Sequence, residues 1–334
     1  MKNILVTGGT GAIGSNLVKK LLVKEDTNKV IILDDNSSGY HNNLIQNDKI
    51  IFVKGNVCDS WVIEQAFTHE ITHVYHLAAN FANQSSVDFP EKDLMTNGIG
   101  IIKLLEASVK NNVKKFLYSS SSCVYKPVDS PFVEHGPIAL TTPYAITKLL
   151  SEYYVTFYNK FKDLPCVVVR YFNNYGPGDY PGRFRSVICN FFWKALRKEP
   201  LVITGDGSET RPFTFVDDIV DGTIVAMEKS EEKIVKNFYS HPIEEDDNLI
   251  YNIANPEVIK IKDLAEKVND VCGNTAGIEY QPRRNWDVIP NRSVCVEKAV
   301  KELGFNPKVN IDEGLKKTLQ WFSSEEFKNE NTRF

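Results

Sequence analysis

Short apolar runs alternate with longer stretches of helical spacing along the first half of the chain. The apolar runs are rich in β-branched or aromatic residues and cover residues 4–7, 30–33, 50–53, 74–77, 116–119 and 166–170. Helical spacing covers residues 11–24, 59–67, 91–111 and 143–161. Short, almost wholly apolar runs are typical of parallel strands that are buried on both faces. Strand and helix in alternation therefore predict an α/β fold built on a doubly wound parallel sheet.

The alternation ends near residue 175. Beyond it, stretches rich in Gly and Pro separate short helical segments, which we expect at residues 186–198, 216–228, 261–272 and 312–322. This change predicts one unit over residues 1–175, to which some later segments return, and a smaller C-terminal α/β substrate domain over residues 176–334. Residues 229–248 contain the acidic run EEDD, and we expect them to form a solvated surface excursion.

Composition narrows the range of partners. The 334 residues include 39 Lys and Arg against 43 Asp and Glu, a formal net charge of −4, whereas nucleic acids and anionic membranes attract basic surfaces. No apolar run approaches the roughly 18 residues of a membrane span. The apolar segment at the N-terminus ends at glycine within a few residues, too early for a signal peptide. We therefore expect a cytoplasmic protein without nucleic-acid or membrane partners.

The six cysteines are scattered along the chain without a C-x-x-C spacing. Their low density gives no sign of a disulfide framework. We expect most of them to be reduced residues of the core.

A glycine-rich loop follows the first predicted strand. Gly8, Gly11 and Gly14 lie in the sequence TGGTGAIG and open the first predicted helix. In this context the first glycine permits a tight turn, the second lets the backbone approach a pyrophosphate, and the third lets the helix pack closely on the sheet. Asp34 ends the second strand, where a carboxylate accepts hydrogen bonds from a ribose 2′-hydroxyl and repels a 2′-phosphate. The loop and the acid predict an NAD site of the Rossmann type; a glycine turn followed by an incidental Asp is the simpler alternative.

Small residues follow two further strands at the same edge of the predicted sheet. Asn56 and Val57 come after the third strand, and Leu77, Ala78 and Ala79 end or follow the fourth. Ligands of open parallel sheets bind at the carboxyl ends of the strands. These residues therefore leave room for the adenine and the nicotinamide.

Tyr144 and Lys148 lie four residues apart near the start of a predicted helix and project from one face of it. An ammonium beside a phenol favours the phenolate, and so lowers the tyrosine pKa from about 10 toward neutrality. Such a base can take a proton from a sugar hydroxyl while hydride leaves for the nicotinamide. The serine run at residues 119–122 follows the fifth strand and can offer a hydroxyl to the same oxygen. An isolated Tyr-x-x-x-Lys is common on protein surfaces. The catalytic interpretation is favoured here because the pair follows the serine run, which ends the fifth strand at the edge where a ligand binds.

Several features together resemble the extended short-chain dehydrogenase/reductase family, and within it the nucleotide-sugar epimerases and dehydratases. They are the glycine loop, Asp34, the HLAA run at residues 76–79, Asn97 before a helix, the serine run ending in Val-Tyr, Tyr144 with Lys148, and RYFNNYGPG at residues 170–178. The resemblance covers about residues 2–322. It implies an NAD-dependent enzyme that acts on a UDP-linked or GDP-linked sugar, and a homodimer formed through the helices at residues 91–111 and 144–161.

The resemblance also implies roles for individual residues. It makes Ser121 the catalytic hydroxyl, Tyr144 the base, and Lys148 the residue that lowers the tyrosine pKa and holds the nicotinamide ribose. The residues implied at the cofactor are Gly8, Gly11, Ala12, Ile13, Gly14, Asp34, Asn36, Asn56, Val57, Leu77, Ala78, Ala79, Asn97, Tyr144, Lys148 and Tyr171. Those implied at the substrate are Ser121, Ser122, Asn173, Arg183, Val187, Arg211, Arg284 and Asp287. Guanidinium forks suit a dianionic pyrophosphate, although Arg211 can instead form a surface ion pair with a nearby aspartate.

The two residues after Ser121 decide which reaction the resemblance favours. In this family a 4,6-dehydratase removes the C5 proton and protonates the leaving 6-hydroxyl with an Asp-Glu pair at these places, and the decarboxylases carry a glutamate there. This chain has Ser122 and Cys123 instead. The resemblance therefore implies an epimerase that inverts C4 through a transient 4-keto sugar. A 4,6-dehydratase or a C4 dehydrogenase of a nucleotide-linked hexose or heptose is the alternative.

Other residues leave further alternatives open. Cys123 can serve as an acid or base if its pKa is shifted, but a small buried hydrophobe is the simpler role. This chain has Phe81 where UDP-galactose 4-epimerases have a lysine, and Trp286 where a glycine is usual. Both differences resemble members of the family that serve surface-polysaccharide synthesis. A redox sensor that binds NAD without turnover is a rival of another class, although such proteins tend to lose the tyrosine or the lysine. We expect no metal site, since His73 and His76 point to opposite faces of a predicted strand.

Overall fold

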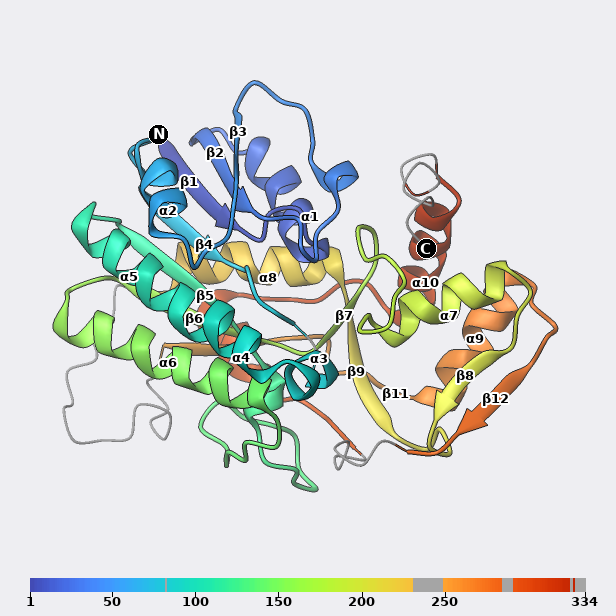
Figure 1. Ribbon diagram of the computed structural model, residues 1–334. Helices are drawn as coiled ribbons and strands as arrows, with labels where there is room; N and C mark the ends of the chain where they lie inside the picture. Colours follow the sequence, from blue (N-terminus) through green and yellow to red (C-terminus); the bar gives the residue numbers. More distant parts are fainter. Residues whose placement is uncertain (82, 231–248, 284–290, 325–326, 328–334) are drawn as a thin grey trace.

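The computed structural model describes residues 1–81, 83–230, 249–283, 291–324 and 327, and Figure 1 shows how its helices and strands are arranged. Its main feature is a seven-stranded sheet with the strand order β10-β6-β5-β4-β1-β2-β3, in which every neighbouring pair is parallel. The strands are β1 (Lys2–Thr7), β2 (Thr27–Asp34), β3 (Ile50–Lys54), β4 (His73–His76), β5 (Lys115–Ser121), β6 (Cys166–Tyr171) and β10 (Ile250–Ile253). The first six coincide with the predicted runs. β10 was not predicted, because its four residues lie alone among loops and helices of the second half of the chain.

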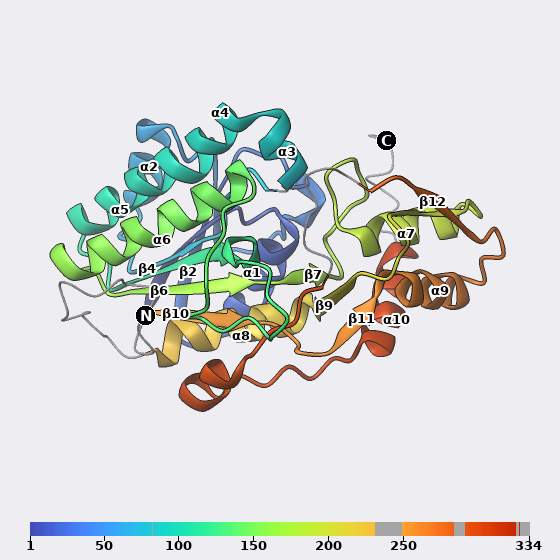
Figure 2. The same ribbon diagram turned by 90° about the horizontal axis from the view of Figure 1, so that it is seen from below.

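Helices cover both faces of this sheet, as Figure 2 shows. Successive residues of a strand point to opposite faces, so Ile4 and Leu5 belong to two different hydrophobic clusters. The cluster around Ile4 includes residues of α1 (Ala12–Leu22) and α8 (Val216–Lys229). The cluster around Leu5 includes residues of α2 (Ser60–Phe67), α5 (Gly100–Lys110) and α6 (Pro143–Phe161). Both faces of every central strand are therefore buried, and the predicted doubly wound α/β fold is confirmed.

The helix predicted over residues 91–111 is divided in the structure. It consists of α4 (Pro90–Asp93), a π-helical segment (Leu94–Ile99) and α5, and α3 (Asn83–Asp88) precedes it. Such π-helical turns are rare and occur frequently at functional sites. This one contains Asn97, whose side-chain contacts are described below.

Residues beyond 172 build a second, smaller group of elements, at the right of Figure 1. A three-stranded sheet contains β7 (Asn173–Tyr175), β9 (Thr210–Phe215) and β11 (Val258–Lys260), and a parallel pair contains β8 (Leu201–Thr204) and β12 (Ile278–Gln281). The helices are α7 (Val187–Leu196), α9 (Ile261–Cys272) and α10 (Ile311–Phe322), close to the predicted segments. Short 3-10 or π-helical turns lie at His41–Asn43, Ser122–Val124 and Ala299–Leu303. Because α8 packs on the large sheet and β10 is one of its strands, the chain returns to this sheet after residue 175. The domain boundary itself stays a prediction.

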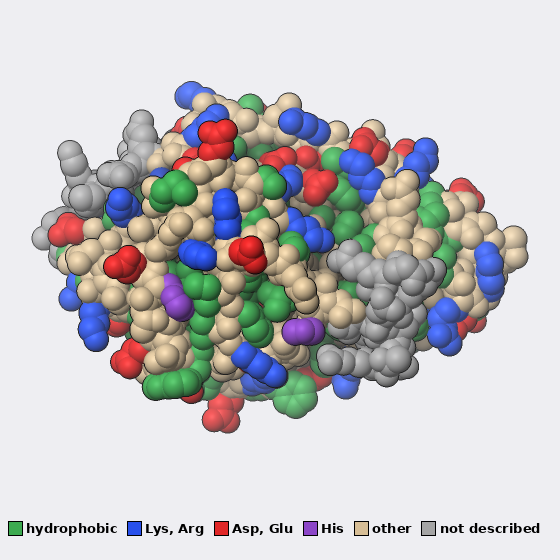
Figure 3. All heavy atoms as spheres, turned by 90° about the horizontal axis from the view of Figure 1, so that it is seen from above, with side chains coloured by type: hydrophobic (Ala, Val, Ile, Leu, Met, Phe, Trp, Pro, Cys, Tyr) green, Lys and Arg blue, Asp and Glu red, His purple; other side chains and the backbone are tan. Residues whose placement is uncertain are grey.

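The surface carries charges of both signs. Figure 3 shows Lys and Arg side chains interspersed with Asp and Glu over one face of the molecule. Within the described ranges, no helix has the length and apolar character needed to cross a membrane. Residues 231–248, most of the predicted surface excursion, lie outside the described residues.

Candidate active site

A cavity of about 800 Å³ lies at the carboxyl ends of the strands of the large sheet and is also lined by residues of the C-terminal elements. The predicted site residues that line it are Gly8, Gly11, Ala12, Ile13, Gly14, Asp34, Asn56, Val57, Leu77, Ala78, Ala79, Ser121, Ser122, Tyr144, Lys148, Tyr171, Asn173, Arg183, Val187 and Arg211. Asn36 and Asn97 are not among the lining residues, and Arg284 and Asp287 lie outside the described part of the chain. Residues from distant parts of the sequence thus meet at the predicted edge of the sheet.

The glycine loop has the geometry of a dinucleotide site. Gly8 has a φ of +73°, and a Cβ atom at this residue would lie 2.7 Å from the backbone nitrogen of Ala78. A Cβ atom at Gly14 would overlap the carbonyl oxygen of Gly8, so α1 can approach the loop only with glycine at this position. Gly11 caps α1 without a side-chain hydrogen bond. Backbone N–H groups at the start of the helix are therefore available to an anion such as a pyrophosphate, and these residues fit NAD.

Asp34 is held at the end of β2 by backbone donors. Its carboxylate accepts hydrogen bonds from the N–H of Thr10 at 2.9 Å and from the N–H of Asn36 at 2.8 Å. Each carboxylate oxygen has a second lone pair, so a ribose hydroxyl can still donate to this side chain. Asn36 was predicted to contact the cofactor. In the structure its side chain accepts a hydrogen bond from the Thr10 hydroxyl at 3.0 Å and so stabilises the loop around Asp34; a cofactor contact of Asn36 stays a prediction.

Asn97, also predicted at the cofactor, is hydrogen-bonded to the segment after β4 in the structure. Its side-chain oxygen accepts from the N–H of Asn80 at 2.9 Å, and its amide donates to the Asn80 carbonyl at 3.1 Å and to Asp93 at 2.9 Å. A side-chain amide matches a backbone N–H and C=O, and here the pair is buried. Asn97 therefore fixes the segment after β4, and Asn80 of that segment lines the cavity.

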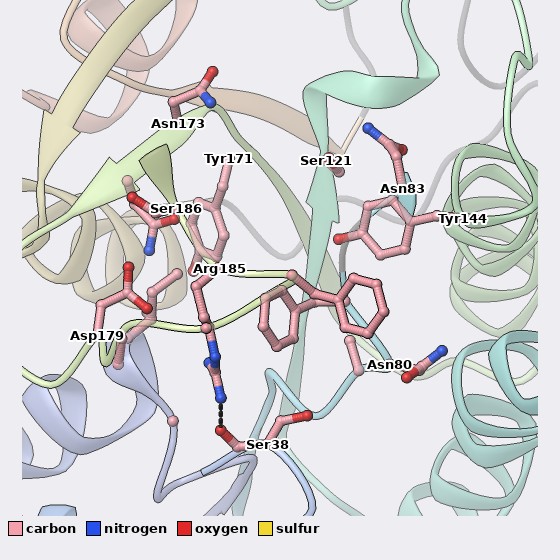
Figure 4. Close-up of a pocket in the computed structure, with 18 of the residues that line it drawn as sticks. Ser38, Asn80, Asn83, Ser121, Tyr144, Tyr171, Asn173, Asp179, Arg185 and Ser186 are labelled. Carbon is pink, nitrogen blue, oxygen red and sulfur yellow. Dashed lines mark hydrogen bonds between the residues drawn. The ribbon is translucent and has the colours of Figure 1, made fainter. Parts of the chain in front are cut away.

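Ser121, Tyr144 and Lys148 lie together at the end of β5 and the start of α6. Thr142 caps α6, and its hydroxyl accepts a hydrogen bond from the N–H of Ala145 at 3.3 Å, which sets the direction of the helix. The Lys148 ammonium donates to the Ser119 carbonyl at 2.8 Å and lies 5.6 Å from the centroid of the Tyr144 ring. Figure 4 shows Ser121 and Tyr144 on the same side of the cavity. The phenol, the hydroxyl and the ammonium are thus within reach of one substrate.

The predicted lowering of the Tyr144 pKa is wrong, because in the structure this pKa is raised. Burial raises the pKa of Tyr144, and a charge on the nearby Cys123 thiol raises it further, whereas a hydrogen bond from Ser121 acts in the opposite direction. Burial also lowers the pKa of Lys148 to about 8, although Asp93 and Glu152 act against it. The physical reason is that both groups lose hydration, and desolvation disfavours the charged form of each.

A buried ion pair lies next to the elements that carry Ser121, Tyr144 and Lys148. Glu152 lies on α6 four residues after Lys148, and its carboxylate accepts from Nε of Arg170 at 2.9 Å and from Nη2 at 2.6 Å. It also accepts from the Ser120 hydroxyl, next to Ser121. Arg170 donates to the Glu134 carbonyl at 2.9 Å. This network ties α6, β5 and β6 together directly beneath the site.

The opposite side of the cavity contains charged residues that sequence reasoning missed. Figure 4 shows Arg185 reaching Ser38, whose carbonyl accepts its hydrogen bond. The Arg185 guanidinium also lies 5.3 Å from the ring centroid of Tyr40 and 4.7 Å from that of Phe81, so it joins the loops after β2 and β4. Burial raises the pKa of Asp179 to about 6, with Arg185 acting against it. The segment that contains Asp179 and Arg185 has no helical or strand periodicity. Its closeness in sequence to Arg183 was the only signal that could have predicted these two residues.

The predicted anion-binding residues differ in their surroundings. Arg211 is buried in β9 and donates to the Thr210 carbonyl at 2.9 Å. Arg183 has 75% of its side chain exposed and forms an ion pair with Asp88 at 3.2 Å. Both line the cavity, and so does Arg292, which was not predicted. With Arg185, four arginines of the described residues therefore line the cavity.

The cysteines are less buried than expected. All six are free, but only Cys166 and Cys189 are buried, and Cys58, Cys123, Cys272 and Cys295 are partly exposed. Cys123 lines the cavity and contacts polar groups, so it is not a hydrophobic core residue. In the described part of the chain, no three His, Cys, Asp or Glu side chains are grouped so that they could hold a metal ion.

Comparisons with known proteins agree with this geometry. The sequence pattern of the NAD dependent epimerase/dehydratase family matches residues 4–243. The chain is 30% identical to a putative UDP-glucose 4-epimerase from Methanocaldococcus jannaschii, over 96% of this chain and 98% of that protein. It is 32% identical to a UDP-N-acetyl-alpha-D-glucosaminuronate decarboxylase from Bacillus cytotoxicus, with the same coverage of 96% and 98%. The solved structure of an epimerase from Methanothermobacter thermautotrophicus is similar with a TM-score of 0.89 and 42% identity, and the match covers 96% of this chain and 92% of that one.

Proposed function

The chain belongs to the NAD dependent epimerase/dehydratase family, and from this premise we propose that it inverts C4 of a sugar linked to a nucleoside diphosphate. The reaction passes through a transient 4-keto sugar. NAD, which the glycine loop and Asp34 would hold, would supply the hydride acceptor for oxidation at C4 and the hydride donor for re-reduction of the ketone. The nucleotide is UDP or GDP. What carries the proposal is that Ser121, Tyr144 and Lys148 line one cavity, while the two residues after Ser121 are not carboxylates.

Each catalytic residue has one task in this mechanism. Tyr144 takes the proton from the 4-hydroxyl as the ketone forms, and gives it back when the ketone is reduced. Ser121 donates a hydrogen bond to the same oxygen and holds it beside the phenol. Lys148 stabilises the phenolate, since its ammonium lies over the Tyr144 ring and is fixed by the Ser119 carbonyl. Burial raises the pKa of the Tyr144 phenol, and Lys148 counteracts this effect only while it is protonated.

The carboxylates that line the described cavity support inversion over elimination. They are Asp34, Asp35, Asp179 and Glu209. Asp34 ends β2 and Asp35 follows it, and Figure 4 shows Asp179 at the opposite side of the view from Tyr144. A 4,6-dehydratase needs an acid and a base beside C5 and C6, close to the tyrosine. Position 123, where such enzymes resemble one another in carrying a glutamate, is a cysteine here.

The diphosphate is proposed to bind at the guanidinium groups on the far side of the cavity. Arg211 is buried in β9, and Asn173 begins β7, so both project from the smaller sheet. A buried arginine presents a fixed fork to two phosphate oxygens. This placement leaves the sugar between the diphosphate and Tyr144.

We also propose a homodimer formed through α6 and the neighbouring π-helical segment. Leu94, Ile146, Phe157 and Phe161 on these elements have 45–48% of their surface exposed. Apolar side chains that gather on adjacent helices are a common feature of interfaces between subunits. A second copy of the chain would bury them.

The reaction is tested by NMR of purified protein incubated with UDP-linked and GDP-linked hexoses. C4 inversion is expected. The proposal would give way to one of the alternative reactions if the product lost its 6-hydroxyl, lost a carboxyl group or remained a 4-ketone. Tyr144→Phe should lower the rate by about 10²–10⁴. The matched control is Tyr154→Phe, on the same helix but outside the cavity lining, which should retain the rate. Equal rates for Tyr144→Phe and wild type would refute the mechanism.

A further inference from the structure

The segment between β7 and α7, residues 176–186, is fastened to the part of the molecule that contains the glycine loop. The Asn16 amide, on α1, donates to the Pro177 carbonyl at 2.9 Å. The ring centroids of Tyr180 and Tyr40 lie 3.9 Å apart, which joins the segment to the loop after β2. The segment therefore connects the C-terminal elements to the edge of the cavity where the glycine loop lies.

Arg185 extends from this segment to both of the loops that border the cofactor end of the cavity. Its guanidinium donates to the Ser38 carbonyl and lies 5.3 Å from the ring centroid of Tyr40, in the loop after β2. It also lies 4.7 Å from the ring centroid of Phe81, in the loop after β4. A guanidinium at such a distance is attracted by an aromatic ring. Figure 4 shows the Arg185 side chain extending to Ser38 through the middle of the view.

The side of the cavity that contains the glycine loop has no basic side chain of its own. Among the described lining residues before residue 80, Asp34 and Asp35 are acidic and none is Lys or Arg. The pyrophosphate of NAD carries two negative charges, and the backbone N–H groups at the start of α1 offer only partial positive charges. Any cation that meets the pyrophosphate therefore comes from another segment of the chain.

Of the four arginines that line the described cavity, Arg185 is the one held at the loop after β2. Arg183 pairs with Asp88 of α3, Arg211 is buried in β9, and Arg292 lies beside the turn after β5. A guanidinium has five N–H donors, more than the Ser38 carbonyl can take. Arg185 can therefore keep this contact and still donate to phosphate oxygens, for which a guanidinium fork is well suited.

We propose that Arg185 is a cofactor-binding residue that closes the cavity over NAD and donates to its pyrophosphate. Its contacts with Ser38 and Phe81 join the two loops across the cofactor, so NAD leaves only when the guanidinium moves away. The inference goes beyond the proposed function, since it depends on NAD and not on the reaction at the sugar. Slow release nevertheless serves C4 inversion, because NADH has to stay until the ketone is reduced.

The rate at which the cofactor dissociates tests this role. Purified protein is loaded with NADH and mixed with excess NAD, and the loss of bound-NADH fluorescence gives the rate. Arg185→Met keeps the apolar stem but removes the charge and the donors, so release should be at least about 10-fold faster than from wild type. Arg185→Lys keeps the charge without the planar fork, and its rate should lie between the two. Release from Arg185→Met at the wild-type rate would overturn the proposal.

Arg197→Met is the matched control. Arg197 follows α7 outside the cavity lining, where it pairs with Glu199 at 2.8 Å, so this variant should release NADH as wild type does. Calorimetry then separates a phosphate contact from a change in loop shape. Arg185→Met should bind ADP-ribose more weakly than wild type and adenosine, which has no phosphate, equally well. An equal loss for both ligands would assign Arg185 to the shape of the loop and overturn its contact with the pyrophosphate.

Hydrogen exchange of the unmodified protein provides a test that needs no variant. With NAD bound, backbone N–H groups of residues 176–186 and of the glycine loop should exchange more slowly than without it. Residues 60–67 of α2, outside the cavity lining, are the internal control and should not change. Protection of the glycine loop without protection of residues 176–186 would overturn closure by this segment. Absence of NAD binding would instead contradict the cofactor site itself, and this inference with it.

Discussion

Replacement of Glu152 by glutamine is expected to destabilise the protein more than any exposed charge change. Glu152 has 1% of its side chain exposed and Arg170 has 0%, and two hydrogen bonds of 2.9 and 2.6 Å join them. Glutamine keeps the shape but removes the negative charge, which leaves the Arg170 guanidinium buried without a counter-charge. Breaking one side of a buried ion pair costs about 3–5 kcal/mol. The free energy of unfolding should therefore fall by about that amount.

Urea unfolding followed by circular dichroism measures this change, with Glu199→Gln as the matched control. Glu199 pairs with Arg197 on the surface, where the two side chains are 40% and 55% exposed, so its loss should not move the unfolding midpoint detectably. A double variant, Glu152→Leu with Arg170→Met, should recover much of the lost stability, because it buries no unpaired charge. A Glu152→Gln midpoint equal to that of the control would refute the assignment of a large energy to this pair.

Three further predictions concern the glycine loop, Lys148 and the proposed dimer. Gly14→Ala places a Cβ atom against the Gly8 carbonyl oxygen, so calorimetry should show loss of NAD binding, and unchanged affinity would contradict the close packing of α1. Because the site needs protonated Lys148 and burial lowers its pKa to about 8, turnover should fall as the pH rises through about 8; a fall only near the ordinary value of 10.5 would contradict this. Phe157→Asp, on the exposed face of α6, should convert a dimer into a monomer by light scattering, whereas Trp61→Asp on α2 should not. Wild-type protein that is already monomeric would refute the interface.

The residues that line the cavity were predictable where the signal is local. Gly8 follows β1, and Asp34 and Ser121 end β2 and β5. Parallel strands bring their carboxyl ends to one edge whatever the connecting loops are. Tyr144 and Lys148 share a helix face because residues four apart project from the same side of a helix. Pattern and spacing along the chain are sufficient for these positions.

The remainder depends on contacts between distant segments. Asn83 and Arg292 meet Cys123 from 40 and 169 residues away, and no periodicity in one segment records where the other lies. The pairing of the Asn97 amide with the backbone of Asn80, 17 residues away, likewise has no signal in the local sequence. The pKa of Tyr144 was also misjudged, because the lysine is visible in the sequence and burial is not.

Cys123 changes what the missing carboxylates mean. Without an acidic residue after Ser121, the sequence favours a site limited to hydride transfer, since no other base is evident there. In the structure, the Asn83 amide nitrogen lies 3.5 Å from the Cys123 sulfur and Nη1 of Arg292 lies 3.9 Å from it. Burial raises the pKa of this thiol, but the Arg292 charge and the hydrogen bonds outweigh burial, so the pKa falls below its ordinary value. A titratable group therefore occupies this position although a carboxylate does not, and loss of a charged residue from a motif is weak evidence against a chemistry when the fold supplies a counter-charge from elsewhere.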